Sequence, residues 1–287
     1  MNALSRLWDS GWTLRISLLL LLGVLVLAVA GPALAPYDPL AQNTAIALQN
    51  PTPAHLFGTD YLGRDVLSRL FAGAPASLLS AVGAALIGLL VGAVPGALSA
   101  FAPRVGEWLA LRAVDALLSL PFILFAIVFA ALLGNGLIQA TLAIGILIAP
   151  GFFRVARAAT LRVRESPYVE ASALLGASAW WVLTRHVSRQ VAPNLVVAGI
   201  SALGSALLTV ASLTFLGIGV QPPDPTWGGM LASDLGYLSQ RPLGPLAPAL
   251  AIILTVASLN LLADAARDAL GAEAVPRRTR TTEKTHV

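Results

Sequence analysis

The sequence predicts an all-α, polytopic membrane protein with about six transmembrane helices. Of its 287 residues, 57% are hydrophobic and only 11% are charged, and the mean hydropathy is +0.79. A soluble domain usually carries about 25% charged residues. Long stretches have no charged residue at all, among them 70–103, 116–153 and 195–223. This composition leaves no room for a large soluble domain beside the spans.

The first predicted span is Ile16–Ala35, an uncharged run that follows a short amphipathic tail, residues 1–15. About 20 apolar residues suffice to cross a hydrocarbon core of about 30 Å. The alternative is a cleaved signal peptide, whose apolar region is only about 7–15 residues long. The longer run favours an uncleaved span. The more polar, proline-containing residues 36–75 are then expected to form an extracytoplasmic segment.

Residues 76–271 form the predicted membrane core. Its glycine-rich first part lets helices approach closely, and Gly134-Asn135-Gly136 divides a charge-free run that is too long for one span. The predicted spans of this core lie near 76–101, 113–133, 137–153, 195–220 and 244–262. The polar, basic tail 272–287 is expected to be cytoplasmic and disordered.

The middle of the predicted core contains a polar connector, and one proline lies in each of the spans predicted near 113–133 and 137–153. Arg104–Arg112 is interpreted as a short polar connector. Pro121 and Pro150 lie within spans, where proline frees a backbone carbonyl and can kink the helix. Such kinks either shape a pathway or serve packing alone.

The segment 165–194 is polar and basic, although charge-free runs lie on both sides of it. Ser166-Pro167 predicts a helix start, because serine caps helices and proline is tolerated at the first position. Gly176 stands where a left-handed residue ends a helix, and Ser178 can cap a second one. We therefore predict two short helices joined at Gly176.

The basic residues predict the orientation. With both ends inside, all of the 18 Lys and Arg residues fall in inner segments except Arg64, Arg69 and Arg241. Inner loops of membrane proteins carry such an excess of positive charge. Both termini and the segment 165–194 are therefore expected in the cytoplasm.

Within that segment, Glu170-Ala171-Ser172 followed by Gly176 resembles the EAA loop of permease subunits in ATP-binding-cassette importers. Tyr168-Val169 before it and Arg185-His186 after it agree with the family pattern. In that family the loop is the coupling helix that docks on a cytoplasmic ATPase. The resemblance implies these coupling residues: Tyr168, Glu170, Ala171, Ser172, Gly176 and Ala177.

The sequence departs from the family pattern at two places in this loop. Ser172 stands where the family usually has Ala, and Ser188-Arg189 stand where it has Leu-Pro. The next proline of this chain is Pro193. The second departure concerns the exit from the second helix, not the docking surface.

Two further segments resemble the dipeptide, oligopeptide and nickel branch of the same family. HLFGTDYLGRDVLSRL, His55 to Leu70, is similar to the FGTDxxGRDxxSRLxxG segment before the second span, although Pro75 replaces a frequent Arg. QPPDPTWGGML, which begins at Gln221, is also similar to that branch. These residues either fold the outer loops or contact the solute.

The residues of the first outer segment suggest how it folds. Gly58 and Gly63 allow tight turns, and Arg64 can pair with Asp60 or Asp65.

The resemblance implies an importer-type permease fold in the plasma (inner) membrane of a prokaryote. The implied partners are a homologous second permease subunit, two cytoplasmic ATPase subunits or domains, an extracytoplasmic solute-binding protein and membrane lipid, without nucleic acid. ATP and Mg²⁺ would bind to the ATPase subunits, and no cofactor would bind to this chain directly. The implied solutes are di- or oligopeptides, with nickel or another small solute as the alternative.

The sequence lacks the motifs of enzymes and of carriers. It has no cysteine, no GxxxxGK[ST] nucleotide loop, no HExxH and no GxSxG. Its three histidines, His55, His186 and His286, are far apart, so we expect neither a metal site nor catalytic residues. The deep parts of the spans have no ionisable group, which argues against a proton-driven carrier. A channel, a secondary carrier and a membrane enzyme are the rival interpretations.

Overall fold

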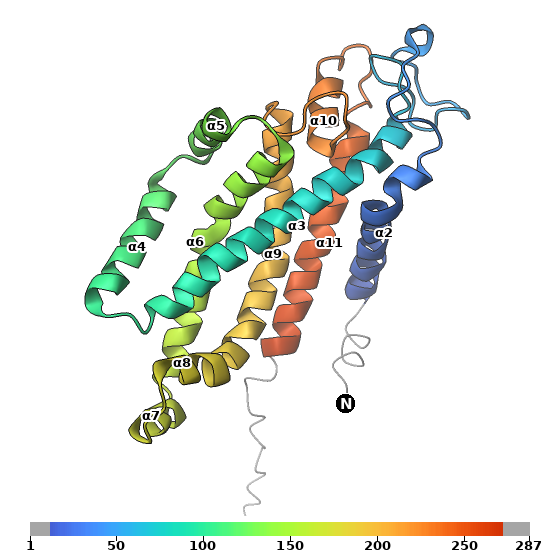
Figure 1. Ribbon diagram of the computed structural model, residues 1–287. Helices are drawn as coiled ribbons and strands as arrows, with labels where there is room; N and C mark the ends of the chain where they lie inside the picture. The colour runs from blue at the N-terminus through green and yellow to red at the C-terminus, as the bar shows by residue number, and fades with distance from the viewer. Residues whose placement is uncertain (1–11, 272–287) are drawn as a thin grey trace, which may run out of the picture.

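Five long helices run side by side and form most of the molecule in the computed structural model, which describes residues 12–271 (Figure 1). They are α2 (Trp12–Leu34), α3 (Val66–Ser99), α6 (Leu137–Arg164), α9 (Ser188–Phe215) and α11 (Leu246–Gly271). Each is long and apolar enough to cross a membrane. The described residues contain no β-strand. The predicted fold class, an all-α membrane protein, is confirmed.

Shorter helices connect the long ones or lie at their ends. They are η1 (Thr44–Ile46), α4 (Arg104–Ser119), α5 (Phe122–Leu133), α7 (Pro167–Leu174), α8 (Ala179–Val182), the π-helical turn η2 (Leu183–Val187) and α10 (Trp227–Leu235). In Figure 1, α7 and α8 lie at the lower end of the bundle, and α10 lies at the upper end.

The predicted span Ala113–Leu133 is wrong as a single helix. The chain forms α4 and α5 instead, with Leu120 extended between them at φ −81° and ψ 128°. Pro121 has no N–H to donate and disfavours a helical residue before it, so α4 ends there. Arg104–Arg112, the predicted polar connector, is the first part of α4.

The two pieces nevertheless cross the bundle together. In Figure 1, α4 and α5 lead from the lower end of α3 to the upper end of α6. The chain therefore traverses the bundle six times, and both described ends, Trp12 and Gly271, lie at the lower end.

Several helices extend beyond the apolar runs that predicted them. Helix α3 begins at Val66 instead of near Ala76, because the Asp65 carboxylate caps it by accepting from the Ser68 N–H at 2.8 Å. Helix α6 continues past Phe153 to Arg164. Hydropathy marks the part of a helix that suits lipid, whereas capping residues decide where the helix ends.

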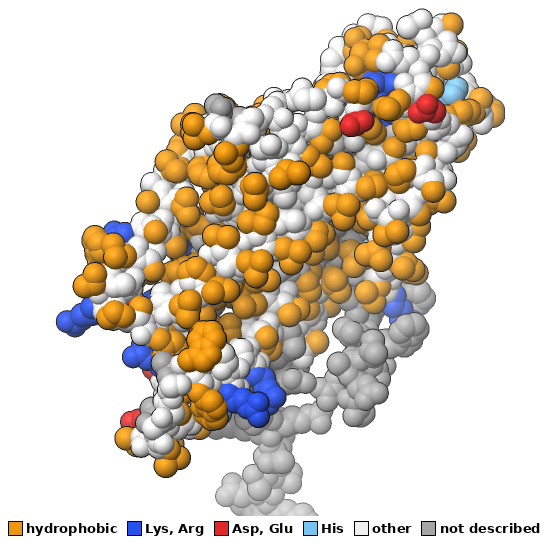
Figure 2. Space-filling model, viewed as in Figure 1, with side chains coloured by type: hydrophobic (Ala, Val, Ile, Leu, Met, Phe, Trp, Pro, Cys, Tyr) orange, Lys and Arg blue, Asp and Glu red, His pale blue; other side chains and the backbone are white. Residues whose placement is uncertain are grey.

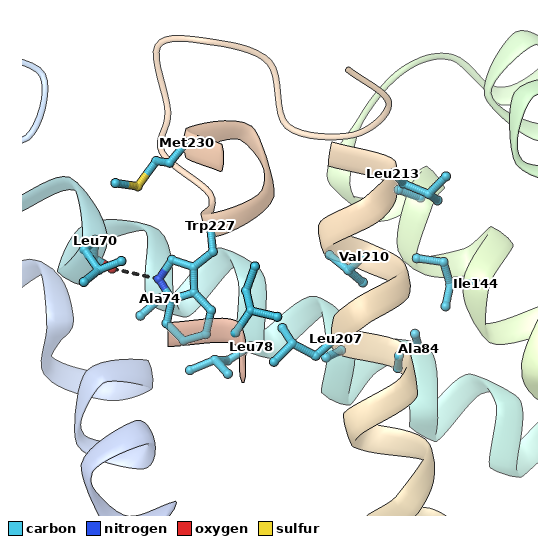
Figure 3. Close-up of a cluster of buried hydrophobic side chains, with 14 of the residues drawn as sticks. Leu70, Ala74, Leu78, Ala84, Ile144, Leu207, Val210, Leu213, Trp227 and Met230 are labelled. Atoms are coloured by element: carbon cyan, nitrogen blue, oxygen red, sulfur yellow. Dashed lines mark hydrogen bonds between the residues drawn. The ribbon is translucent and has the colours of Figure 1, made fainter. Parts of the chain in front are cut away.

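The core lies where α3 crosses α6 and α9. A Cβ atom at Gly92 or Gly96 of α3 would clash with the backbone carbonyls of Ala149 and Phe153 on α6, so these helices touch backbone to backbone. The indole of Trp227, only 1% exposed, enters this core from α10 and donates to the carbonyl of Leu70 at 2.9 Å (Figure 3). Small residues thus serve close packing, as the sequence predicts.

The surface is that expected of a membrane protein. Figure 2 shows hydrophobic side chains over the middle of the visible face, with Lys and Arg mainly toward the lower end. Leu19, Leu90 and Leu132 are among the large apolar side chains that are exposed. A lipid environment removes the cost of such exposure.

Candidate functional site

The predicted loop begins directly after α6 with α7. The carbonyl of Ser166 accepts from the N–H groups of Val169 and Glu170, at 3.0 and 3.2 Å, and thereby starts the helix. The hydroxyl of Ser166 donates backwards to the carbonyl of Val163. The predicted start of α7 is therefore correct, but the serine hydroxyl completes α6 and does not cap α7.

Gly176 ends α7 in the left-handed conformation that the sequence predicts, with φ +87°. The N–H of Ala177 donates to the carbonyl of Ser172 at 3.0 Å, the bond that defines a Schellman C-cap. A Cβ atom at Gly176 would meet nothing within 4 Å. The need for glycine is therefore conformational and not steric. Ser178 then caps α8 as predicted, accepting from the Trp181 N–H at 3.2 Å.

The exit from this loop differs from the prediction. The chain stays helical from α8 through the π turn η2 into α9, so no separate span begins at Leu195. Ser188 and Arg189 both supply backbone N–H groups, which lets the helix propagate where a Leu-Pro pair would interrupt it. The segment 165–194 is therefore one short helix, a bend, and the first turns of a long helix.

One face of the loop packs inward. Val169 of α7 is buried in an apolar cluster with Val182, Val187 and Val191. The ring of Tyr168 lies 5.7 Å from that of His186, and the Tyr168 hydroxyl accepts from Nε2 of Gln190 at 2.6 Å. These contacts fix α7 against the beginning of α9.

The opposite face is exposed and partly apolar. Leu174 is 85% exposed, Leu175 89% and Trp180 68%, and Glu170 and Ala171 are exposed beside them. Within residues 12–271, no hydrogen bond or ion pair holds the Glu170 side chain. Large apolar side chains at the tip of a polar loop indicate a docking surface.

The structure thus divides the predicted coupling residues. Glu170, Ala171 and Gly176 are exposed, Tyr168 is 40% exposed but contacts His186 and Gln190, and Ala177 packs against the buried cluster. The Ser172 hydroxyl donates to the carbonyl of Tyr168 within α7. Sequence reasoning missed Leu174, Leu175 and Trp180; the signal was a large apolar group on each side of the glycine bend.

A groove of about 1030 Å³ runs between α6 and α9. Most of its lining is apolar, including Ile148 and Phe152. Its polar and charged lining residues are Arg162, Gln190, Asn194, Ser201, Ser205 and Arg267. The charged ones, Arg162 and Arg267, lie near the C-terminal ends of α6 and α11.

At the other end of the bundle, the first outer segment folds on itself. Gly58 and Gly63 have positive φ values of 70° and 74°, as the expected turns require. The buried Arg64 Nε donates to Asp60 at 2.7 Å, so Asp60 is its ion-pair partner and Asp65 is not. Asp65 caps α3 and lies 2.9 Å from Nδ1 of His55.

The two outer segments are also tied to each other. Arg69 donates to the carbonyls of Pro39 and Pro223, at 3.0 and 3.4 Å. The backbone N–H of Trp227 donates to the hydroxyl of Ser77 at 3.0 Å. Burial raises the pKa of Asp234 to about 6, although Arg241 opposes the shift. These contacts show that residues of both segments help to fold the outer loops, while contact with the solute stays a prediction.

Residues 12–271 hold no cluster of three or more His, Asp or Glu side chains that could bind a metal ion. His55 pairs with Asp65 and His186 packs against Tyr168, at opposite ends of the bundle. His286 and the predicted tail 272–287 lie outside the described residues, as do residues 1–11.

Comparison with known proteins gives a consistent result. Residues 92–274 match the family model described as "Binding-protein-dependent transport system inner membrane component". The chain is 39% identical to the di/tripeptide transport system permease protein DppC of Pseudomonas aeruginosa, over 88% of this chain and 86% of that protein.

Other relatives have related names. A probable D,D-dipeptide transport system permease protein, DdpC of Escherichia coli K12, is 36% identical over 88% of this chain and 84% of its own length. The glutathione transport system permease protein GsiD of Pectobacterium atrosepticum is 36% identical over 77% of this chain and 74% of its own length.

A solved structure shares the fold. A chain of the MetNI methionine ABC transporter, in an inward-facing conformation, matches with a TM-score of 0.60 at 19% identity. The match covers 70% of this chain and 96% of that chain.

Proposed function

Because this chain belongs to the family of binding-protein-dependent transport system inner membrane components, we propose that it is the membrane-spanning subunit of an ATP-driven importer of short peptides. The similarity to DppC over 88% of the chain carries this proposal. The FGTD and QPPDPTWGG segments support it, because both resemble the peptide branch of this family and because Arg69 and Trp227 tie the two outer segments together.

The working complex would contain three further kinds of component. A second, homologous permease would complete the pathway, and an extracytoplasmic binding protein would deliver the peptide. Two cytoplasmic ATPase subunits or domains would bind ATP and Mg²⁺, so this chain would have no catalytic residue. It would lie in the inner membrane with both termini in the cytoplasm.

The exposed face of α7 would receive the ATPase. Leu174, Leu175 and Trp180 would be buried on docking, and Glu170 would accept from basic or amide donors of the ATPase. Electrostatic complementarity of this kind fixes the register of an interface. The inner face of the loop, packed on α6 and α9, would carry the movement into the membrane.

Peptide import tests the proposed solute. The complex is reconstituted in liposomes whose lumen corresponds to the cytoplasm and contains ATP, and the binding protein is added outside. These liposomes are expected to take up a labelled mixture of di- and tripeptides. Omitting the binding protein should abolish uptake, and labelled glutathione serves as a second peptide probe. No peptide uptake together with robust uptake of a nickel chelate or a sugar would assign the chain another solute.

Thiol labelling tests the orientation, since the chain has no cysteine of its own. Single cysteines at Leu56 and Gln221, both exposed at the upper end, should react with an impermeant reagent in intact cells. A cysteine at Glu165, exposed at the lower end, should react only after the membrane is opened. Labelling of Glu165→Cys in intact cells would reverse the assignment.

A further inference from the structure

Gln190 belongs to two parts of the molecule at once. Its Nε2 donates to the hydroxyl of Tyr168 at 2.6 Å, and the same side chain lines the groove between α6 and α9. Among the described residues, this is the only side-chain hydrogen bond between α7 and the helix that follows Gly176. It joins residues 22 positions apart in the sequence.

Aromatic packing holds the same contact in place. The His186 ring lies 5.7 Å from the Tyr168 ring and 4.9 Å, edge-on, from the Trp181 ring. His186 is part of the π turn η2, one turn before Gln190 on the same continuous helix. The beginning of α7 is thus clamped to the first turns of α9.

The far end of α7 has no comparable support. Leu174 and Leu175 are almost fully exposed, and a Cβ at Gly176 would meet empty space. A force applied to the exposed face of α7 is therefore resisted mainly at Tyr168 and at the buried Val169. Val169 belongs to an apolar cluster that includes Ala159, a lining residue of the groove, whereas Tyr168 reaches the lining residue Gln190 through a directed hydrogen bond.

The path of α9 is what brings Gln190 to this position. The helix stays regular through Ser188-Arg189, and its first proline, Pro193, stands four residues after Arg189. Four residues are about one helical turn. The turn between Arg189 and Pro193 contains Gln190, which lines the groove together with Asn194 and Arg162.

We propose that Gln190 is a positioning residue that transmits the tilt of α7 to the groove between α6 and α9. This role rests on the proposed function, in which an ATPase docks on the exposed face of α7. Closure of the ATPase would move Tyr168, and the hydrogen bond would carry that movement to Gln190 and the first turns of α9.

The test measures the number of peptides imported per ATP hydrolysed by the reconstituted complex, using the labelled di- and tripeptide mixture. Tyr168→Phe and Gln190→Leu each remove the hydrogen bond while keeping a side chain of similar size. Each should lower this ratio about fivefold, which corresponds to about 1 kcal/mol, the usual net contribution of one hydrogen bond. Both variants should retain the ATPase subunits during purification.

The double variant Tyr168→Phe/Gln190→Leu distinguishes transmission through this pair from two independent effects. It should lose no more than either single variant, because the bond can be removed only once. Ser188→Ala, which loses a hydroxyl that bonds within its own helix to the Thr184 carbonyl, should keep the wild-type ratio.

The outcomes are separable. An active wild-type complex with unchanged ratios in both single variants, additive losses in the double variant, or loss of the ATPase subunits would overturn the role of Gln190 and leave the proposed function intact. Absence of peptide uptake by the wild-type complex would contradict the proposed function itself, and the role of Gln190 with it.

Discussion

Replacing Glu170 by Arg is expected to detach the ATPase subunits and to lower peptide uptake at least tenfold. The side chain is exposed on the outer face of α7 and has no ion-pair partner among the described residues. In the proposed complex it would face the ATPase, and a positive charge there would meet the donors from which the carboxylate would accept. Like-charge juxtaposition at an interface costs several kcal/mol, and each 1.4 kcal/mol weakens binding tenfold.

The measurement is uptake and ATP hydrolysis at equal membrane levels of the variant and the wild type. Asp268→Arg is the matched control, since Asp268 is also an exposed acid at the lower end of the bundle but lies in α11. It should behave as the wild type. Equal losses in both variants would indicate a general effect of charge instead of a docking contact.

Gly176→Val is expected to reduce solute-stimulated ATP hydrolysis and uptake by a factor of about 5 to 30 while membrane insertion stays normal. The φ of +87° is strained for a residue with a Cβ, at a cost of about 1–2 kcal/mol, and most so for a β-branched one. Relief of that strain would turn α7 and its exposed Leu174 and Leu175 away from the docking position.

Two substitutions at Gly176 separate conformation from bulk. Asn tolerates the left-handed region much better than Val does, so Gly176→Asn should retain most of the uptake. There is open space around this position, so a larger side chain brings no clash. Equal damage by Asn and Val would mean that contact with a partner, and not backbone conformation, requires glycine.

The local features of the loop could be predicted because they depend on neighbouring residues. A left-handed C-cap needs little more than Gly176 at the end of a helix. The N-cap formed by Ser178 needs only the backbone N–H groups of the residues that follow it. The pairing of Tyr168 with Gln190 could not, because it depends on the angle at which α7 returns to α9. The sequence alone contains no signal for that angle.

The prolines within the spans also show how much of the structure the sequence alone can predict. Pro150 and Pro193 remain inside α6 and α9, whereas the chain leaves the helix at Pro121. Pro150 is fully buried and Pro121 is exposed, but burial alone does not decide the outcome, because the exposed Pro95 also stays inside its helix, α3. Local sequence marks each proline as a place where a helix is weakened, but it does not show at which of them the helix ends.

In the proposed complex, the ATPase docks on α7. The most direct test is the amount of ATPase subunit that copurifies with the affinity-tagged permease, per permease molecule. Wild type and Asp268→Arg should retain the same amount, and Glu170→Arg should retain less than a tenth of it. Full retention by Glu170→Arg, with wild-type uptake by both Glu170→Arg and Gly176→Val, would show that this loop is not the coupling element.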